Sequence, residues 1–303
     1  MFPIIPATSA TAASGNDEGI FGFGVGAGGY VSTTNLVSNA GVVATDVAGV
    51  GTARYYVMGC EYGGDKGIFA YGKASGGGKL SMSNLVSNAG VVATDVAGVG
   101  TARYNGGACG YGDDKGIIGY GTDDVGDNSE TNLVSNAGVV ATDTAGVGTA
   151  RSGIRACGYG GDKGIFAYGY DGDIGATNVS MSNLVSNVGV VGTDVTGVGT
   201  ARNSLAACSY GEDKGIFGYG TTAGPLAVTN LVSNVGVVAT DTAGVGTART
   251  ALNATHYGQD KGIFGYGSPT TAITNLVSNV GVVATDVAGV GTARVGLAAC
   301  SFN

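Results

Sequence analysis

The stretch that decides the fold is Asn230-Leu-Val-Ser-Asn234, followed by Val235-Gly-Val-Val-Ala-Thr-Asp-Thr242 and then by Thr247-Ala-Arg249. Near copies of this stretch divide the chain of 303 residues into six units, spaced by 49, 48, 51, 47 and 45 residues. The copies begin at Asn35, Asn84, Asn132, Asn183, Asn230 and Asn275. They are rich in glycine and in β-branched residues, which disfavour a helix and favour short strands.

Each unit contains four candidate strands, and a period near 48 residues is typical of the blades of a β-propeller. In one unit the strands are 205–210, 214–220, 230–234 and 235–242. The first unit begins at its second strand, in 17–24, and the last is followed by an unmatched first strand, 295–302. We therefore expect an all-β, six-bladed β-propeller with four-stranded blades, whose C-terminal strand joins the three N-terminal strands and closes the ring. We expect residues 16–303 to form this propeller and residues 1–15 to form an N-terminal arm.

The second strand of each unit predicts sheets that are buried on both faces. In Lys66-Gly-Ile-Phe-Ala-Tyr-Gly72, strict alternation places Ile68 and Ala70 on one face of the sheet and Phe69 and Tyr71 on the other. An aromatic face pressed against the small-residue face of the next blade fits the usual sheet spacing of about 10 Å.

The composition excludes several classes of protein. Lys plus Arg number 14 against 22 Asp plus Glu, a net charge of −8, so no basic surface for nucleic acid is expected. No apolar run approaches the length of a membrane-spanning helix, so we expect no membrane insertion. The segment 1–6 lacks the basic region of a signal peptide. The single histidine, His256, has no recognisable Ser or Cys partner, so we expect no catalytic residues, no enzyme activity and no cofactor.

Two repeated positions are interpreted as scaffold. The first is a cysteine six residues after an Arg, found as Cys60, Cys109, Cys157, Cys208 and Cys300, with Thr255 at the sixth place. Equivalent atoms of neighbouring blades are too far apart for disulfides, so buried free thiols are expected rather than disulfides or a metal site.

The second repeated position is an Asp eight residues before each Arg, which predicts an ion pair that braces the crossing between blades. The alternative is a ring of arginines that binds an anion on the propeller axis. The expected pairs are Asp46 with Arg54, Asp95 with Arg103, Asp143 with Arg151, Asp194 with Arg202, Asp241 with Arg249, and Asp286 with Arg294.

With these elements the chain resembles the kelch-like repeat. In that pattern an Arg precedes a small-residue strand, a turn leads to a Gly-Ile-Phe strand ending in glycines, and an Asn-Leu-Val strand follows a variable loop. The match covers residues 17–302, but Tyr-Gly replaces the usual diglycine and the chain has no Trp. It looks closer to the Gly-rich kelch-like repeats of tailed-bacteriophage tail and virion proteins, on Ala44-Thr-Asp46, Ala53-Arg54 and Gly59-Cys60. The resemblance implies a virion-associated or cell-surface binding protein.

The six units differ mainly in two segments, the loop between the second and third strands and the residues directly after each Arg. In a propeller both segments lie on the same face, so we expect this variable-loop face to bind a partner. Unconstrained drift of the loops is the alternative. Clustered carboxylates there are also the ligands that Ca²⁺ takes, although a full calcium-binding loop is lacking. The candidate residues are Tyr30, Tyr55, Tyr56, Lys79, Tyr104, Asn105, Asp123, Asp124, Asp127, Glu130, Arg155, Tyr170, Asp171 and Asp173.

We therefore expect a non-enzymatic virion or tail-associated propeller, such as part of a tail fibre. It would bind a host-surface glycan or protein receptor, or another virion protein, at the virion or the cell surface. Exposed tyrosines are suitable platforms for sugars. A homo-oligomer within a particle is compatible with this role. The alternatives are a lectin-like bacterial adhesion module that binds glycans and a purely structural assembly protein. A copper enzyme of the galactose-oxidase kind needs clustered Tyr, His and Cys ligands, and a single His argues against it.

Overall fold

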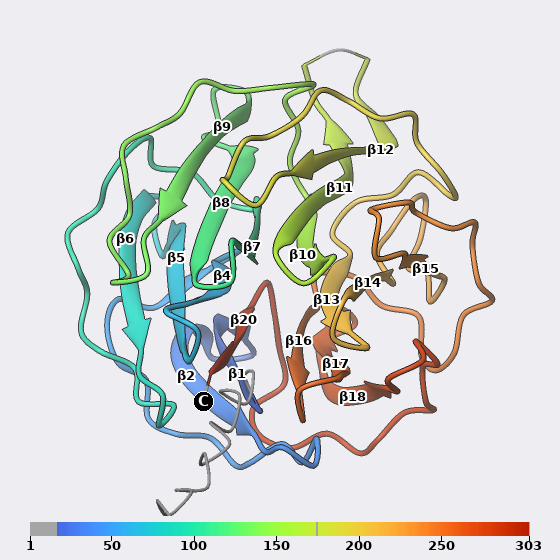
Figure 1. Ribbon diagram of the computed structural model, residues 1–303. Helices are drawn as coiled ribbons and strands as arrows, with labels where there is room; N and C mark the ends of the chain where they lie inside the picture. The colour runs from blue at the N-terminus through green and yellow to red at the C-terminus, as the bar shows by residue number, and fades with distance from the viewer. Residues whose placement is uncertain (1–16, 174, 303) are drawn as a thin grey trace, which may run out of the picture.

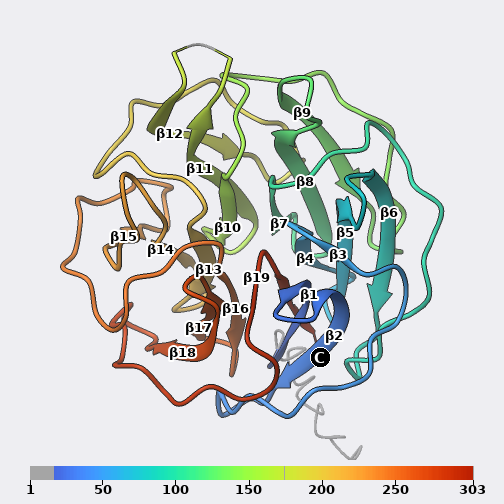
Figure 2. The ribbon, with the colours of Figure 1, turned by 180° about the vertical axis from the view of Figure 1, so that it is seen from behind.

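The structure, a computed structural model, describes residues 17–173 and 175–302. These residues form six small antiparallel sheets and contain no helix, so none that could span a membrane. Figures 1 and 2 show the sheets arranged around a common centre, as in a propeller. The all-β prediction is confirmed. The predicted N-terminal arm, 1–15, lies outside the described residues.

Each sheet has an inner strand nearest the centre, a middle strand and an outer strand. The inner strands are β4 (Met58–Tyr62), β7 (Gly107–Tyr111), β10 (Arg155–Tyr159), β13 (Ala206–Tyr210), β16 (Asn253–Tyr257) and β20 (Ala298–Phe302). The middle strands are β1 (Glu18–Gly26), β5 (Lys66–Ala74), β8 (Lys115–Thr122), β11 (Lys163–Asp171), β14 (Lys214–Gly218) and β17 (Lys261–Gly267). The outer strands are β2 (Gly29–Val37), β6 (Lys79–Val86), β9 (Asp127–Val134), β12 (Thr177–Val185), β15 (Thr229–Val232) and β18 (Thr271–Val277). The two-residue strands β3 (Arg54–Tyr55) and β19 (Arg294–Val295) extend the inner edges of two sheets.

The expected fourth strand of each blade is only partly formed. The segment 235–242 pairs with β15 through two isolated bridges, Val232 with Val238 and Thr229 with Thr242. Between these bridges the side-chain amide of Asn230 donates to Ala239 O at 3.0 Å and to Asp241 Oδ1 at 2.9 Å. Because a side chain takes the carbonyl that a continuous ladder would use, the segment is an extended edge and not a regular strand.

The predicted alternation along the middle strand is wrong at Tyr71. A β-bulge lies between Ala70 and Gly72, and Tyr71 itself has a left-handed φ of 61°. The bulge shifts the alternation by one residue, so Tyr71 packs with Ile68 and Ala70 in one core cluster, while Phe69 packs in the cluster on the opposite face. Both faces are buried, as the sequence predicted.

The cysteines are buried and free, which confirms their interpretation as small core residues. Their thiols fill the space left by glycines of the next sheet. A Cβ added at Gly116 of β8 would lie 2.7 Å from Sγ of Cys60 in β4. Burial raises the pKa of the Cys208 thiol to about 12, so this group stays protonated at neutral pH.

The two ends of the described chain pair with each other. β20 lies antiparallel to β1, with Glu18 opposite Phe302 and Gly22 opposite Ala298. A second link consists of backbone hydrogen bonds from one sheet to the next. Each bond joins two residues that lie two positions after a repeated Arg, and the N···O distances are 2.6–3.1 Å. Each of these residues has a left-handed φ between 51° and 63°. In each bond the backbone amide of one residue donates to the backbone carbonyl of another: Tyr56 to Gly296, Asn105 to Tyr56, Gly153 to Asn105, Ser204 to Gly153, Ala251 to Ser204, and Gly296 to Ala251.

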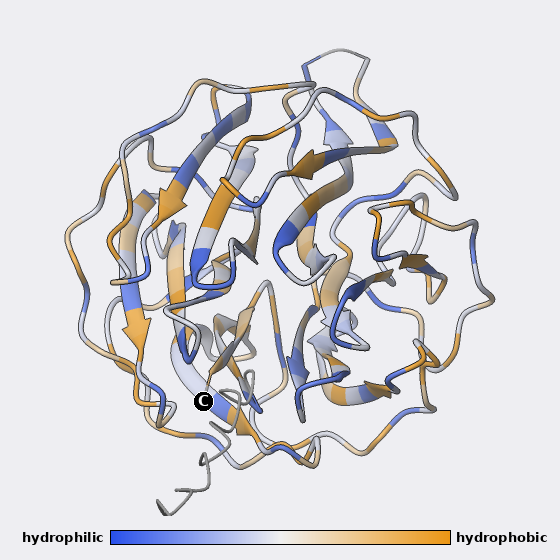
Figure 3. Ribbon diagram, viewed as in Figure 1, coloured by the Kyte–Doolittle hydropathy of each residue, from blue (hydrophilic) through white to orange (hydrophobic). Residues whose placement is uncertain are grey.

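Apolar residues also lie outside the sheets. Figure 3 shows them both on the strands and along the outer connecting segments. On each of those segments a valine recurs at the same place in the repeat, with 62–65% of the residue exposed. These valines are Val42, Val91, Val139, Val190, Val237 and Val282. We call them the valine belt.

Candidate functional site

The repeated arginines belong to the scaffold, but their predicted partners are wrong. Arg54 is fully buried, and its Nη1 lies 3.7 Å from Asp95, the aspartate that follows the outer strand of its own sheet. Asp46 belongs instead to the neighbouring sheet, where its partner is Arg294. The other pairs are Arg103 with Asp143, Arg151 with Asp194, Arg202 with Asp241, and Arg249 with Asp286.

Side chains between the sheets fix each arginine. Nη2 of Arg54 donates to Asn84 Oδ1 at 2.6 Å, and Asn84 donates to Asp95 Oδ1 at 2.9 Å. The guanidinium also stacks 4.3 Å from the ring centre of Phe23 in the preceding sheet. Burial lowers the pKa of Arg54 to about 10, which the charge of Asp95 partly offsets. Because each of the six guanidinium groups already has an aspartate beside it and an asparagine acceptor, they do not form the axial anion ring considered above.

Four of the predicted tyrosines meet on the variable-loop face. Tyr30, Tyr55, Tyr56 and Tyr104 come from three adjacent sheets, and we call them the tyrosine cluster. The ring centres of Tyr30 and Tyr55 lie 5.1 Å apart, and those of Tyr55 and Tyr56 lie 4.5 Å apart. Tyr104 stacks 6.1 Å from Tyr56. All four residues are half-buried, so part of each one remains accessible to a ligand.

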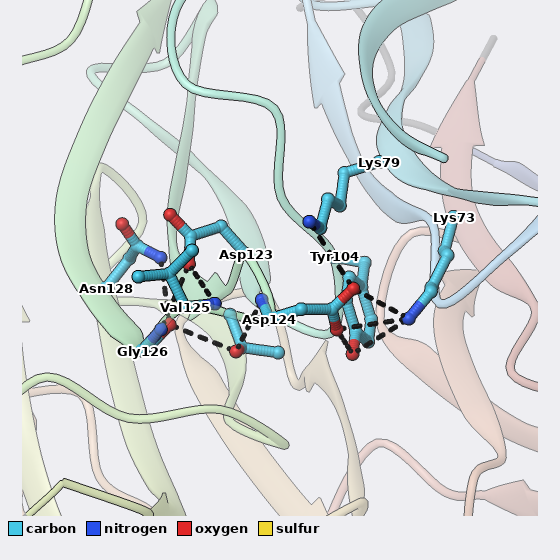
Figure 4. Close-up of polar contacts among 9 residues, drawn as sticks. Lys73, Lys79, Tyr104, Asp123, Asp124, Val125, Gly126 and Asn128 are labelled. Carbon is cyan, nitrogen blue, oxygen red and sulfur yellow. Dashed lines mark hydrogen bonds and ion pairs between the residues drawn. The ribbon is translucent and has the colours of Figure 1, made fainter. Parts of the chain in front are cut away.

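Charged groups join one edge of the tyrosine cluster (Figure 4). The Lys73 ammonium lies 4.6 Å from the centre of the Tyr104 ring and 2.9 Å from Asp124 Oδ2. Asp124 also accepts a hydrogen bond from the Tyr104 hydroxyl and lies 3.5 Å from Lys79 Nζ. The hydrogen bonds from Tyr104 and Lys73 lower the pKa of Asp124 to about 2. Two ammonium groups face one carboxylate, so this edge carries a positive charge within an acidic chain.

The hairpins explain why these residues meet. Lys73 and Lys79 are paired across the hairpin β5–β6, and Asp124 lies in the turn between β8 and β9. Asp123 caps this turn, because its carboxylate accepts from the amides of Val125 at 2.9 Å and Gly126 at 3.1 Å. Asp123 therefore stabilises the loop that carries Asp124.

The other predicted acidic residues form a second group, away from the tyrosines. The Asp127 carboxylate accepts from the Gly172 amide at 2.8 Å, and the Asp173 carboxylate accepts from the Asp127 amide at 3.2 Å. Tyr170 belongs to the same hairpin, β11–β12, and Asp171 is buried there. Burial raises the pKa of Asp127.

The structure does not support two further interpretations of the acidic residues. Glu130 lies within β9 and not in a loop, and its Oε2 is buried without a hydrogen-bond partner. The Ca²⁺ alternative gains no support, because the described residues contain no group of three or more His, Cys, Asp or Glu that could share an ion.

Two predicted residues lie at the centre and not on the loop surface. Arg155 is the first residue of β10 and is buried, and Asn105 accepts a long hydrogen bond of 3.5 Å from its Nη1. Both are near the ring of left-handed residues described above, which places them where the inner strands meet the variable-loop face.

A cavity of about 210 Å³ at the opposite face was missed by the sequence reasoning. Glu61, Ser209 and His256 line it, together with turn residues such as Asp113 and Glu212. Burial lowers the pKa of His256, and the nearby charge of Glu61 opposes this effect. The Ser209 hydroxyl bonds to the Gly158 backbone and not to the imidazole. The sequence did contain a signal for this cavity, because the residue that follows the repeated cysteine position differs in type between units.

Comparison with known proteins adds no relatives. The chain matches no protein-family model and no curated protein.

Proposed function

We propose that this chain is a six-bladed, kelch-like propeller closed by the pairing of β20 with β1, and that it is a non-enzymatic binding protein. The register of β20 on β1 and the ion pair between Arg294 and Asp46 support the closure. The six backbone hydrogen bonds between the left-handed residues support it independently.

The observation that carries the binding function is the tyrosine cluster. The scaffold repeats six times, but the positions directly after the repeated Arg hold Tyr55-Tyr56 and Tyr104-Asn105 in two adjacent sheets. The other sheets have Ser152-Gly153, Asn203-Ser204, Thr250-Ala251 and Val295-Gly296 there. Half-buried aromatic rings beside lysines and a carboxylate suit the apolar faces and hydroxyls of a sugar, or a complementary protein surface.

The ligand that we propose is a host-surface glycan or protein receptor, or another virion protein. The resemblance to kelch-like repeats of phage tail and virion proteins supports a virion or cell-surface location. A lectin-like bacterial adhesion module would use the same cluster in the same way.

The valine belt favours a second candidate, a purely structural subunit. A repeated row of exposed apolar side chains is a feature of surfaces that associate with other proteins. In that case the chain would assemble into a symmetric particle and bind no sugar.

A glycan array followed by titration calorimetry tests the proposal. We expect one class of glycan to bind the wild type, and Tyr55→Ala and Tyr104→Ala to weaken binding at least about tenfold, because stacking on each ring is lost. Tyr170→Ala is the matched control on another hairpin and should bind normally. Equal binding by all variants would place the ligand elsewhere. An empty array together with a defined oligomer in analytical ultracentrifugation would favour the structural subunit.

A further inference from the structure

Arg155 is a buried cation without a carboxylate partner. Only 6% of the residue is exposed, and the equivalent positions of the other inner strands carry uncharged residues, namely Met58, Gly107, Ala206, Asn253 and Ala298. Among the described residues no Asp or Glu lies within ion-pair distance of Arg155, and the segments outside them contain neither residue type.

The hydrogen bonds of Arg155 leave its charge uncompensated. Nη1 donates to the carbonyls of Ile154 at 2.7 Å and Gly106 at 3.2 Å, whereas Nε is buried without a partner. Two scaffold arginines, Arg249 and Arg294, also have an unpartnered Nε, but each of them lies beside an aspartate. Burial lowers the pKa of Arg155 to about 10, which still leaves it charged at neutral pH. A buried charge without a counter-ion is costly in free energy.

Arg155 also lines a cavity at the centre of the molecule. The cavity measures about 30 Å³, and its walls come from the inner strands β4, β7, β10, β13 and β16. Glycine, alanine and methionine residues make up most of the lining, so Arg155 is its charged member. A space of this size exceeds the roughly 10–15 Å³ that one water needs. It therefore fits a small ion or the end of a ligand, and not a whole sugar.

We propose that this cavity binds a small monovalent anion against the Arg155 guanidinium. The anion is a free halide or the carboxylate group of a larger molecule, since both bring a compact negative charge to a buried guanidinium that has no carboxylate partner. This site is distinct from the tyrosine cluster, and it does not depend on whether that cluster binds a glycan.

The test is thermal unfolding of the full chain at constant ionic strength, with sodium methanesulfonate replaced stepwise by sodium bromide. Methanesulfonate is larger than bromide and carries no carboxylate. Because bound anion stabilises only the folded state, Tm of the wild type should rise by about 2–4 °C for each tenfold increase in bromide above its Kd. Arg155→Met should show no bromide dependence, and it should melt at or above the wild type in methanesulfonate. Methionine is a suitable replacement because Met58 occupies the equivalent position.

Lys66→Met is the matched control, since it removes one exposed positive charge and should keep the full bromide shift. Bromide-soaked wild-type crystals should show an anomalous peak in this cavity beside the Arg155 guanidinium, a readout that needs no variant. Competition of N-acetylneuraminate with bromide would identify a carboxylate ligand, and bromide binding without competition would identify a free ion. A wild-type Tm that is equal in methanesulfonate and bromide, or a shift that Arg155→Met retains, overturns the proposal.

Discussion

Cys60 and Gly116 illustrate how single residues set the distance between neighbouring sheets. The thiol of one inner strand occupies the place where a side chain would stand on the middle strand of the next sheet. The same relation links Cys109 with Gly164, and Thr255 with Gly19, where threonine replaces the cysteine. Glycine is therefore needed at these positions for close packing, while the small thiol fills the remaining space.

We predict that Gly116→Ala destabilises the protein by about 1–3 kcal/mol, because the added methyl group would lie 2.7 Å from the sulfur of Cys60. Urea unfolding at pH 7 measures this change. The double variant with Gly116→Ala and Cys60→Ala should lose about 1 kcal/mol less free energy of unfolding than the two single variants lose in sum, since the smaller side chain at position 60 makes room for the methyl group.

Gly78→Ala is the control for this prediction. A Cβ at Gly78 meets no atom within 4 Å, and its φ is not left-handed, so the free energy of unfolding should change by less than about 0.5 kcal/mol. If Gly116→Ala were equally neutral, the sheets would tolerate a wider spacing than the Cys–Gly contact implies.

Among the strands, the sequence predicted most of what depends on local pattern. Short strands, tight turns and sheets buried on both faces follow from the repeat and from its glycine and β-branched residues. The bulge at Tyr71 was missed because strict alternation assumes an unbroken register. The fourth strand was overestimated because the Asn230 side chain takes the carbonyl of Ala239, and the backbone pairs with the edge segment only through isolated bridges.

The Asn of each Asn-Leu-Val-Ser-Asn stretch connects a buried arginine with an aspartate, so it should contribute strongly to stability. Asn132 accepts from Arg103 Nη2 at 2.6 Å and donates to Asp143 Oδ1 at 2.9 Å. We predict that Asn132→Ala lowers the free energy of unfolding by about 2–4 kcal/mol, because a buried charged donor loses its partner. Chemical denaturation at neutral pH measures the loss.

The second Asn of the same stretch offers a matched control. Asn136 is exposed, and its amide bonds to Asp114 at 3.0 Å on the surface. Asn136→Ala should therefore change stability by no more than about 0.5 kcal/mol. Similar losses for both variants would mean that the buried network is no more important than a surface contact.

At the scale of the whole molecule, the sequence identified which residues differ between units but not where their side chains point or which residues they contact. Variation between units pointed to Tyr30, Tyr55, Tyr56 and Tyr104, and the structure brings these four residues together. The same criterion also selected Asp123, which caps its own turn, and Arg155, which points to the centre. Sequence variation shows where the repeat is relaxed, but direction and partners depend on which sheets become neighbours. The partner of Asp46 is 248 residues away for the same reason.

The proposed closure makes the last strand as important as any in the core. Ala298, Cys300 and Phe302 of β20 share a buried cluster with Ile20 of β1 and with Phe69 of the next sheet. Without β20, the inner edge of β1 would present unpaired backbone groups beside exposed apolar side chains, which is a template for aggregation.

We predict that deleting residues 295–303 lowers Tm by about 10 °C or more and causes aggregation, because the loss of Phe302 alone removes about 3–5 kcal/mol of packing. Differential scanning calorimetry and size-exclusion chromatography measure both effects.

A circular permutant distinguishes the effect of ring closure from the effect of losing the residues themselves. It joins Phe302 to Asp17 through two glycines, which reproduces the turn Tyr62-Gly-Gly-Asp65, and it opens the chain at Gly161 in the equivalent turn. If the ends are true neighbours, the permutant should remain monodisperse with a Tm close to that of the wild type. A stable truncated chain, or a permutant that cannot fold, would contradict the closed ring.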